Sequence, residues 1–125
     1  MTPTSSTSPR EATASDDTAM QACIDACQSC HAECLRTIQH CLGLGGAHAS
    51  LEHISLMASC ADICATSADT MLLGAAVHAH TCGACAAVCR QCAKSCRSIG
   101  QEPQLLRCAE QCDRCADECE RMSAG

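Results

Sequence analysis

The sequence predicts an all-α fold, an antiparallel four-helix bundle with a cysteine-lined core, and three observations support this prediction. The 16 cysteines of the 125-residue chain recur in alternating steps of four and three residues. In ordinary bundles Leu, Ile and Val have this spacing, because it places side chains on the stripe that faces the neighbouring helices. Glycine and proline divide the chain into four helical segments of roughly twenty residues, and short turns between such segments favour antiparallel neighbours.

The first segment is predicted to be a helix that follows a disordered leader. Residues 1–15 are rich in Ser, Thr and Pro and contain no apolar stretch, which is not typical of a secretory signal. Ser15 then offers an N-cap hydroxyl, and the two aspartates after it place acidic charge at the positive end of the helix dipole. The helix is expected to end near Leu42, where a glycine-rich stretch follows. The bundle domain is therefore predicted to span residues 16–122.

The second and third helices are marked by their ends. Ser50 is the expected start of the second helix, which continues to about Leu73 and is followed by Gly74. The third helix is expected to begin within residues 75–78 and to end at Gly100.

The fourth helix is expected to have Pro103 in its first turn, where proline is favoured, and to continue to about Met122. Conventional apolar packing is thin across the four helices, because the chain has no Phe, Trp or Tyr and only 16 Leu, Ile and Val residues. A buried cysteine behaves as a small hydrophobe, so thiols are expected to replace aliphatic side chains in the core.

Extending the four-three register to the helix ends defines a core stripe on each predicted helix. It contains every cysteine: Cys23, Cys27, Cys30, Cys34, Cys41, Cys60, Cys64, Cys82, Cys85, Cys89, Cys92, Cys96, Cys108, Cys112, Cys115 and Cys119. It also contains four methionines and two histidines: Met20, Met57, Met71, Met122, His53 and His78. Thr37, Ser50, Ser67, Ile99 and Leu105 complete the stripe. Sulfur and imidazole are the donors that bind Cu(I) or Zn(II), so these residues are candidate metal ligands.

Charge and cysteine content narrow the class of partner. The net charge of −6 argues against nucleic acid, because phosphate contacts need clustered Lys and Arg. No segment is apolar enough to span a membrane. Without an export signal the expected compartment is the reducing cytoplasm, where many cysteines in one chain are more typical of metal ligands than of disulfides.

The cysteine spacing favours Cu(I). The Cys-x-x-x-Cys pair occurs seven times, and side chains four residues apart on a helix have Cβ atoms about 5–6 Å apart. Each pair is therefore a two-thiolate unit. Cu(I) accepts two or three sulfurs and shares bridging thiolates, so adjacent pairs are expected to merge into a chain of sites along the bundle axis.

Antiparallel order predicts which residues meet at each end. One end is expected to gather thioether and imidazole groups that pass a soft ion inward, from Met20, Met71, His78 and Met122. The opposite end gathers Cys41, His53, Met57, Cys96 and Leu105. The four other histidines lie off the core stripe and are expected at the surface: His31, His40, His48 and His80.

Other functions remain as alternatives. Zinc prefers four ligands, and the second helix has only two cysteines, so most four-helix layers are expected to lack one thiolate. A zinc or cadmium buffer of the metallothionein type and a small copper chaperone are the remaining alternatives. Disulfides, a Cys-x-x-Cys redox centre and an iron–sulfur carrier are less favoured by the spacing. No Ser/His/Asp set, carboxylate pair or phosphate loop stands out, so the protein is not expected to be an enzyme.

Seven Cys-x-x-x-Cys pairs with isolated Cys41 and Cys82, over residues 16–122, resemble the bacterial cytosolic copper storage proteins. The resemblance implies a preformed bundle that binds many Cu(I) ions through paired and bridging thiolates, for copper storage or detoxification. It implies an entrance for copper at the His/Met end, here His78 with Met20, Met71 and Met122. The second helix departs from the pattern, because His53, Met57 and Met71 occupy its core stripe.

The resemblance also implies a homotetramer, with copper ions and copper chaperones as candidate partners. Several apolar residues lie off the core stripe, and an interface between bundles would bury those that a single bundle exposes. They are Leu42, Leu44, Ile54, Leu56, Ile63, Leu72 and Leu73.

Overall fold

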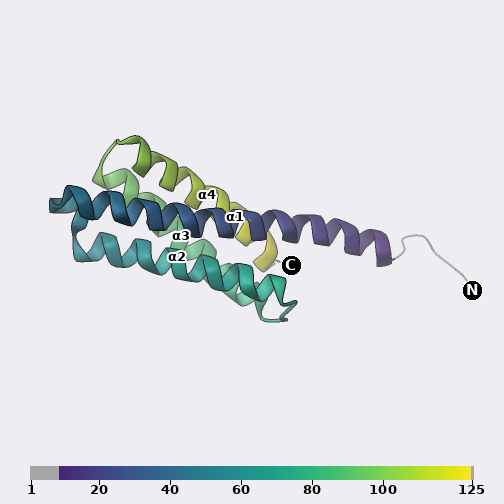
Figure 1. Cartoon of the computed structure of the whole chain (residues 1–125). Helices are drawn as coiled ribbons and strands as arrows, with labels where there is room; N and C mark the ends of the chain where they lie inside the picture. Colours follow the sequence, from purple (N-terminus) through teal and green to yellow (C-terminus); the bar gives the residue numbers. More distant parts are fainter. Residues whose placement is uncertain (1–8, 125) are drawn as a thin grey trace, which may run out of the picture.

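The computed structural model describes residues 9–124, which form four long α-helices and one short 3₁₀-helix (Figure 1). The elements in chain order are α1 (Pro9–Leu44), η1 (Gly46–Ala49), α2 (Leu51–Leu72), α3 (His78–Ile99) and α4 (Pro103–Ala124).

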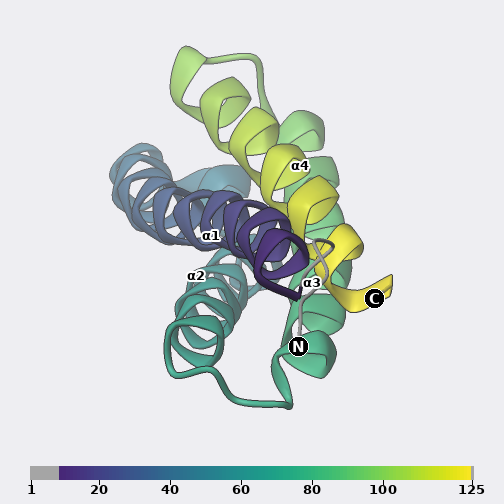
Figure 2. The ribbon, with the colours of Figure 1, turned by 90° about the vertical axis from the view of Figure 1, so that its right-hand side faces the viewer.

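The four helices form a ring in which each packs against its neighbours in the chain. α4 packs against both α3 and α1, so it closes the ring, as the view along the bundle in Figure 2 shows. Short connections reverse the chain between successive helices, so their directions alternate (Figure 1). The predicted antiparallel four-helix bundle is confirmed.

The start of α1 differs from the prediction. α1 begins at Pro9 instead of after Ser15, so the predicted leader overlaps the helix over residues 9–15. The prediction gave the N-cap signal at Ser15 too much weight, since a proline with its fixed φ is also favoured at the first helical position. The rest of that leader, residues 1–8, lies outside the described residues. The N-terminal part of α1 extends beyond the ends of the other helices (Figure 1).

The other helix ends agree closely with their sequence signals. Ser50 caps α2, and its hydroxyl accepts a hydrogen bond from the His53 backbone N–H at 3.2 Å. Gly74 follows α2 with a φ of 68°, which lies in the left-handed region that glycine adopts without strain. Pro103 is the first residue of α4. Within residues 9–124, no helix combines the length and hydropathy needed to cross a bilayer.

Sulfur fills the interior of the bundle. All 16 cysteine side chains are completely buried, and Met57, Leu105, Thr37 and Ser67 are buried between them. Small alanines on the helix flanks, such as Ala109, allow the helices to approach closely. The predicted cysteine-lined core is therefore confirmed, and residues far apart in the sequence bring their thiols together inside it.

Candidate metal centre

Twelve of the 16 buried thiols form one continuous network of Sγ–Sγ contacts that connects all four helices. Each step along it joins two Sγ atoms at 3.5–4.0 Å, and none of the 16 cysteines forms a disulfide. From one end of the bundle the path runs through Cys23, Cys119, Cys27, Cys115, Cys64, Cys89, Cys60, Cys112, Cys30, Cys34 and Cys108. Soft donors therefore continue along much of the bundle axis without a break.

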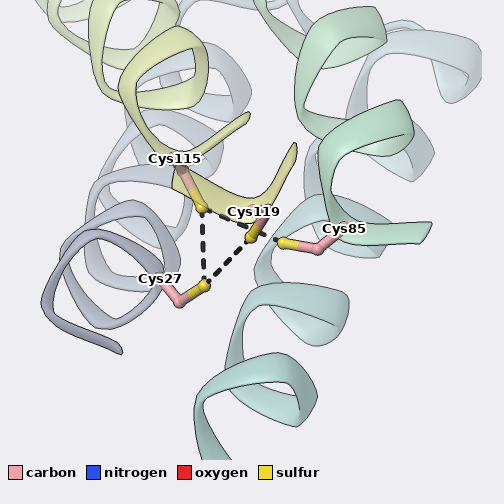
Figure 3. Close-up of side chains that lie close together, drawn as sticks. All are labelled: Cys27, Cys85, Cys115 and Cys119. Atoms are coloured by element: carbon pink, nitrogen blue, oxygen red, sulfur yellow. Dashed lines mark hydrogen bonds between the residues drawn. The ribbon is translucent and has the colours of Figure 1, made fainter. Parts of the chain in front are cut away.

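Groups of four thiols recur along this network. Figure 3 shows one of them, in which Cys27 of α1, Cys85 of α3, and Cys115 and Cys119 of α4 point toward one another. In each group all four Sγ atoms lie within 4.8 Å of one another. Four further groups are Cys30/Cys60/Cys64/Cys89, Cys30/Cys34/Cys60/Cys112, Cys34/Cys92/Cys108/Cys112 and Cys64/Cys85/Cys89/Cys115.

These groups correct the argument against zinc. The prediction expected most layers to lack one thiolate because α2 has only two cysteines. The structure instead builds groups of four by taking two successive cysteines from one helix, such as Cys60 and Cys64 of α2. Four thiolates are what a tetrahedral zinc site needs, so the number of nearby donors does not by itself select Cu(I) over zinc.

The closest thiol pairs join different helices. Within single helices the Sγ–Sγ distance is 4.0 Å for Cys30 and Cys34 and 3.8 Å for Cys85 and Cys89. Across helices it falls to 3.5 Å between Cys27 and Cys119. Side chains on facing stripes point at one another, whereas neighbours on one helix point in parallel. Non-covalent contacts between helices therefore connect the two-thiolate units that were predicted within single helices, and sequence spacing does not reveal these contacts.

Burial and mutual hydrogen bonds divide the thiols into two classes. Hydrogen bonds from Cys115 and then Cys119 lower the pKa of Cys27 to about 5, because S–H donors stabilise a thiolate. Cys119 itself donates a hydrogen bond to Cys115. This raises the pKa of Cys119, so that thiol keeps its proton. The metal-free network therefore holds thiols beside thiolates, and soft cations that bind there must displace the remaining protons.

The fully buried Cys41 predicts a pH dependence of stability. Burial raises its pKa from 9.0 to about 11, so the folded state keeps a proton that the unfolded chain releases above pH 9. The contribution of this thiol to the free energy of unfolding is fully present below pH 9 and is lost as the pH rises through about 11. The total loss is at most about 2–3 kcal/mol. Thermal unfolding of reduced, metal-free protein at pH 8 and pH 10.5 measures the loss. The Cys41→Ala variant should show a smaller loss, and an equal loss would contradict this assignment.

The end of the bundle near Cys41 combines sulfur with nitrogen. His53 is 2% exposed, and its Nε2 lies 3.6 Å from Cys41 Sγ. Its Nδ1 is hydrogen-bonded to the Ser95 hydroxyl at 2.7 Å, which fixes the orientation of the ring. Burial lowers the pKa of His53, so the imidazole is neutral and its nitrogen is available to a cation. Sequence analysis missed Ser95, because it lies off the core stripe and its contact is formed only in three dimensions.

The opposite end carries the thioether and imidazole side chains predicted there, Met20, Met71, His78 and Met122, which are called the His/Met ring below. Met71 is buried, whereas Met20, Met122 and His78 are half-buried, and both half-buried methionines pack against the thiol core. Hydrogen bonds with Cys119 and Cys23, together with a smaller electrostatic contribution from His78, lower the pKa of Cys82 to about 3. The antiparallel bundle places these helix ends at the same end of the molecule, and the convergence of the four side chains on one ion stays a prediction.

Three of the four histidines off the core stripe are less exposed than predicted. His31 is half-buried, and its Nδ1 is hydrogen-bonded to the Ala61 carbonyl oxygen at 2.8 Å. His40 and His48 are also half-buried, and both are hydrogen-bonded to Glu102. These bonds lower the pKa of the Glu102 carboxyl to about 2. His80 is exposed as predicted.

Comparison with known proteins finds one family whose model matches this chain and several solved structures that are similar to it. The family model described as "Copper storage protein" matches residues 16–124. The structure of the Nmul_A1745 protein from Nitrosospira multiformis is 44% identical to this chain, with a TM-score of 0.81, and the match covers 86% of this chain and 97% of that one. No curated protein matches the chain significantly.

Two further similar structures are those of copper storage proteins. The Cu(I)-bound copper storage protein BsCsp3 is 30% identical, with a TM-score of 0.79 and coverage of 84% of this chain and 98% of that one. A cytosolic copper storage protein from Streptomyces lividans, in a copper-loading structure with five coppers, is 30% identical with a TM-score of 0.80. That match covers 90% of this chain and 98% of the Streptomyces chain.

Proposed function

The chain belongs to the copper storage protein family, and on this basis we propose that it stores many Cu(I) ions on the thiols of its bundle core. The observation that carries the proposal is the continuous network of buried cysteines without disulfides. The Cu(I)-bound state of BsCsp3 supports the choice of ion. The cytosolic relative from Streptomyces supports a cytoplasmic location. Storage is a non-catalytic role, in agreement with the family to which the chain belongs.

The spacing of the thiols suits low-coordinate copper. With metal–sulfur bonds of about 2.3 Å, two thiolates in line need sulfurs roughly 4.6 Å apart and three in a plane need roughly 4.0 Å. The observed contacts of 3.5–4.0 Å reach these values through small side-chain rotations. Bridging thiolates would then serve two ions each, so that all 16 cysteines take part and each ion displaces thiol protons.

A titration separates this proposal from its alternatives. Reduced protein would be titrated with Cu(I) under anaerobic conditions against a chromophoric competitor. Twelve of the cysteines divide into three separate groups of four, so a zinc-type buffer should saturate near three or four ions. A chaperone should bind about one or two, and bridged storage sites should bind well over four. Saturation at four ions or fewer would contradict storage.

We further propose that copper is admitted at the His/Met end and that His53 and Met57 serve the far end of the core. The half-buried Met20, His78 and Met122 are the donors of this set that solvent reaches, whereas Met71 lies deeper. Thioether and imidazole bind Cu(I) at neutral pH without losing a proton, so they suit transient binding.

The triple variant Met20→Ala/His78→Ala/Met122→Ala is expected to take up Cu(I) several-fold more slowly than the wild type. Its final Cu(I) capacity should fall only by the ions that these three side chains would bind themselves. Stopped-flow measurement of transfer from a weak Cu(I) complex gives the rate. The matched control is His80→Ala, which removes an exposed imidazole near the same end. Uptake by the triple variant at the rate of the control would show that copper is admitted elsewhere.

The assembly is proposed to be a homotetramer. Leu42, Leu44, Leu72 and Leu73 are each more than half exposed, which suits burial between bundles. By contrast Ile54, Leu56 and Ile63 already pack against the core of a single bundle. Sedimentation equilibrium gives the mass, and a monomer at micromolar concentration would refute this proposal. Copper chaperones are proposed as the source of the metal.

A further inference from the structure

A second cluster of metal-binding side chains lies outside the thiol core. His40 near the end of α1, His48 in η1 and Glu102 just before α4 meet at the end of the bundle opposite the His/Met ring. The Nε2 atoms of His40 and His48 lie 3.2 and 2.6 Å from the same Glu102 Oε1 atom. The imidazole rings stand edge to face, with centroids 6.2 Å apart. Two nitrogens therefore converge on one carboxylate oxygen.

Local backbone features place these three side chains together. Gly45 and Gly46 have φ values of 73° and 58°, which turn the chain sharply after α1 and bring η1 back toward His40. A side chain at Gly100 would collide with the Glu102 carboxylate, so glycine there leaves the space that the carboxylate occupies. Two successive elements, α1 and η1, and the distant segment before α4 thus contribute one donor each.

The chemistry of this cluster differs from that of the core. Two imidazole nitrogens and a carboxylate oxygen suit borderline divalent ions such as Zn²⁺, whereas thiolates favour soft Cu(I). In a tetrahedral site with bonds of about 2.0–2.1 Å, neighbouring ligand atoms lie roughly 3.3 Å apart. The separation of His40 from Glu102 is already 3.2 Å, and that of His48 from Glu102 would lengthen from 2.6 Å when an ion binds. The side chains are 29%, 21% and 32% exposed, so the cluster is accessible to an ion, and water can complete its coordination.

We propose that His40, His48 and Glu102 form a binding site for one borderline divalent cation of the Zn²⁺ type, separate from the Cu(I) store. In the metal-free protein, ring N–H groups donate to the Glu102 carboxylate, and the cation takes the place of those protons. Because its ligands come from α1, η1 and the segment between α3 and α4, the bound ion ties these segments together at this end of the bundle.

The test uses protein saturated with Cu(I), because occupied thiolates no longer compete for added zinc. Calorimetric titration with ZnCl₂ under anaerobic conditions should show one Zn²⁺ bound per chain. His48→Ala and the isosteric Glu102→Gln should each weaken binding at least about ten-fold. His80→Ala, which removes an exposed imidazole elsewhere, should bind as the wild type does. Zn²⁺ should also raise the unfolding midpoint of the wild type more than that of His48→Ala.

Two results would overturn the proposal. One is the absence of zinc binding by the copper-loaded wild type, which would leave the cluster a hydrogen-bonded contact between segments. The other is unchanged zinc binding in both variants, which would place the ion at other residues. The Cu(I) capacity of both variants is measured in parallel and should match the wild type, so a failure here is distinguishable from a failure of the storage function.

Discussion

Loading the reduced protein with Cu(I) is expected to raise its midpoint of thermal unfolding by more than about 15 °C. A ligand that binds only the folded state adds about 4 kcal/mol of stability at a thousand times its Kd, and each kcal/mol shifts the midpoint by about 4–8 °C in a small domain. The chain has no Phe, Trp or Tyr and the interior contains few aliphatic side chains, so metal–thiolate bonds would supply a large share of the stability.

Differential scanning calorimetry on metal-free, half-loaded and fully loaded protein measures this shift under anaerobic conditions. The released protons, followed with a pH indicator in weak buffer, should rise in step with the copper added, because bound thiols lose their protons. A midpoint that stays constant or falls on loading would show that copper binds the unfolded chain at least as well, and a preformed store would then be excluded.

Removing two thiols from the middle of the network is expected to cost more copper than removing two buried thiols that lie outside it. Cys30 contacts Cys34, Cys89 and Cys112, and the pair Cys30 and Cys112 takes part in three of the five groups of four described above. The double variant Cys30→Ala/Cys112→Ala should therefore lose more than the two-sixteenths of Cu(I) capacity that corresponds to its share of the cysteines.

The matched control is Cys41→Ala/Cys96→Ala, which also removes two fully buried thiols but takes them from outside those five groups. Its loss should not exceed the same two-sixteenths share. Competitor titration gives both capacities, and circular dichroism checks that both variants are folded. Equal losses would show that each cysteine binds copper independently, which would contradict bridged sites along a shared network.

Much of the fold and of the candidate site was predictable from local patterns. The four-three spacing placed every cysteine on the inner stripe, since that stripe is set by the helix repeat alone, and all are buried. Ser50, Gly74 and Pro103 marked their helix ends because capping depends on neighbouring residues. The predicted start of α1 differs from the observed one, because Ser15 and Pro9 are both acceptable helix starts and a local signal does not choose between them.

The sequence by itself determined a bundle of four helices with sulfur facing inward, because helical periodicity is a property of the chain over short distances. Only the tertiary structure decided which thiols meet: the 3.5 Å contact of Cys27 with Cys119, and the entry of both α2 cysteines into groups of four. The same holds for Ser95 beside His53 and for the approach of His40 and His48 to Glu102. Such contacts depend on the rotation and axial offset of whole helices, which packing across the bundle sets and spacing along one helix does not encode.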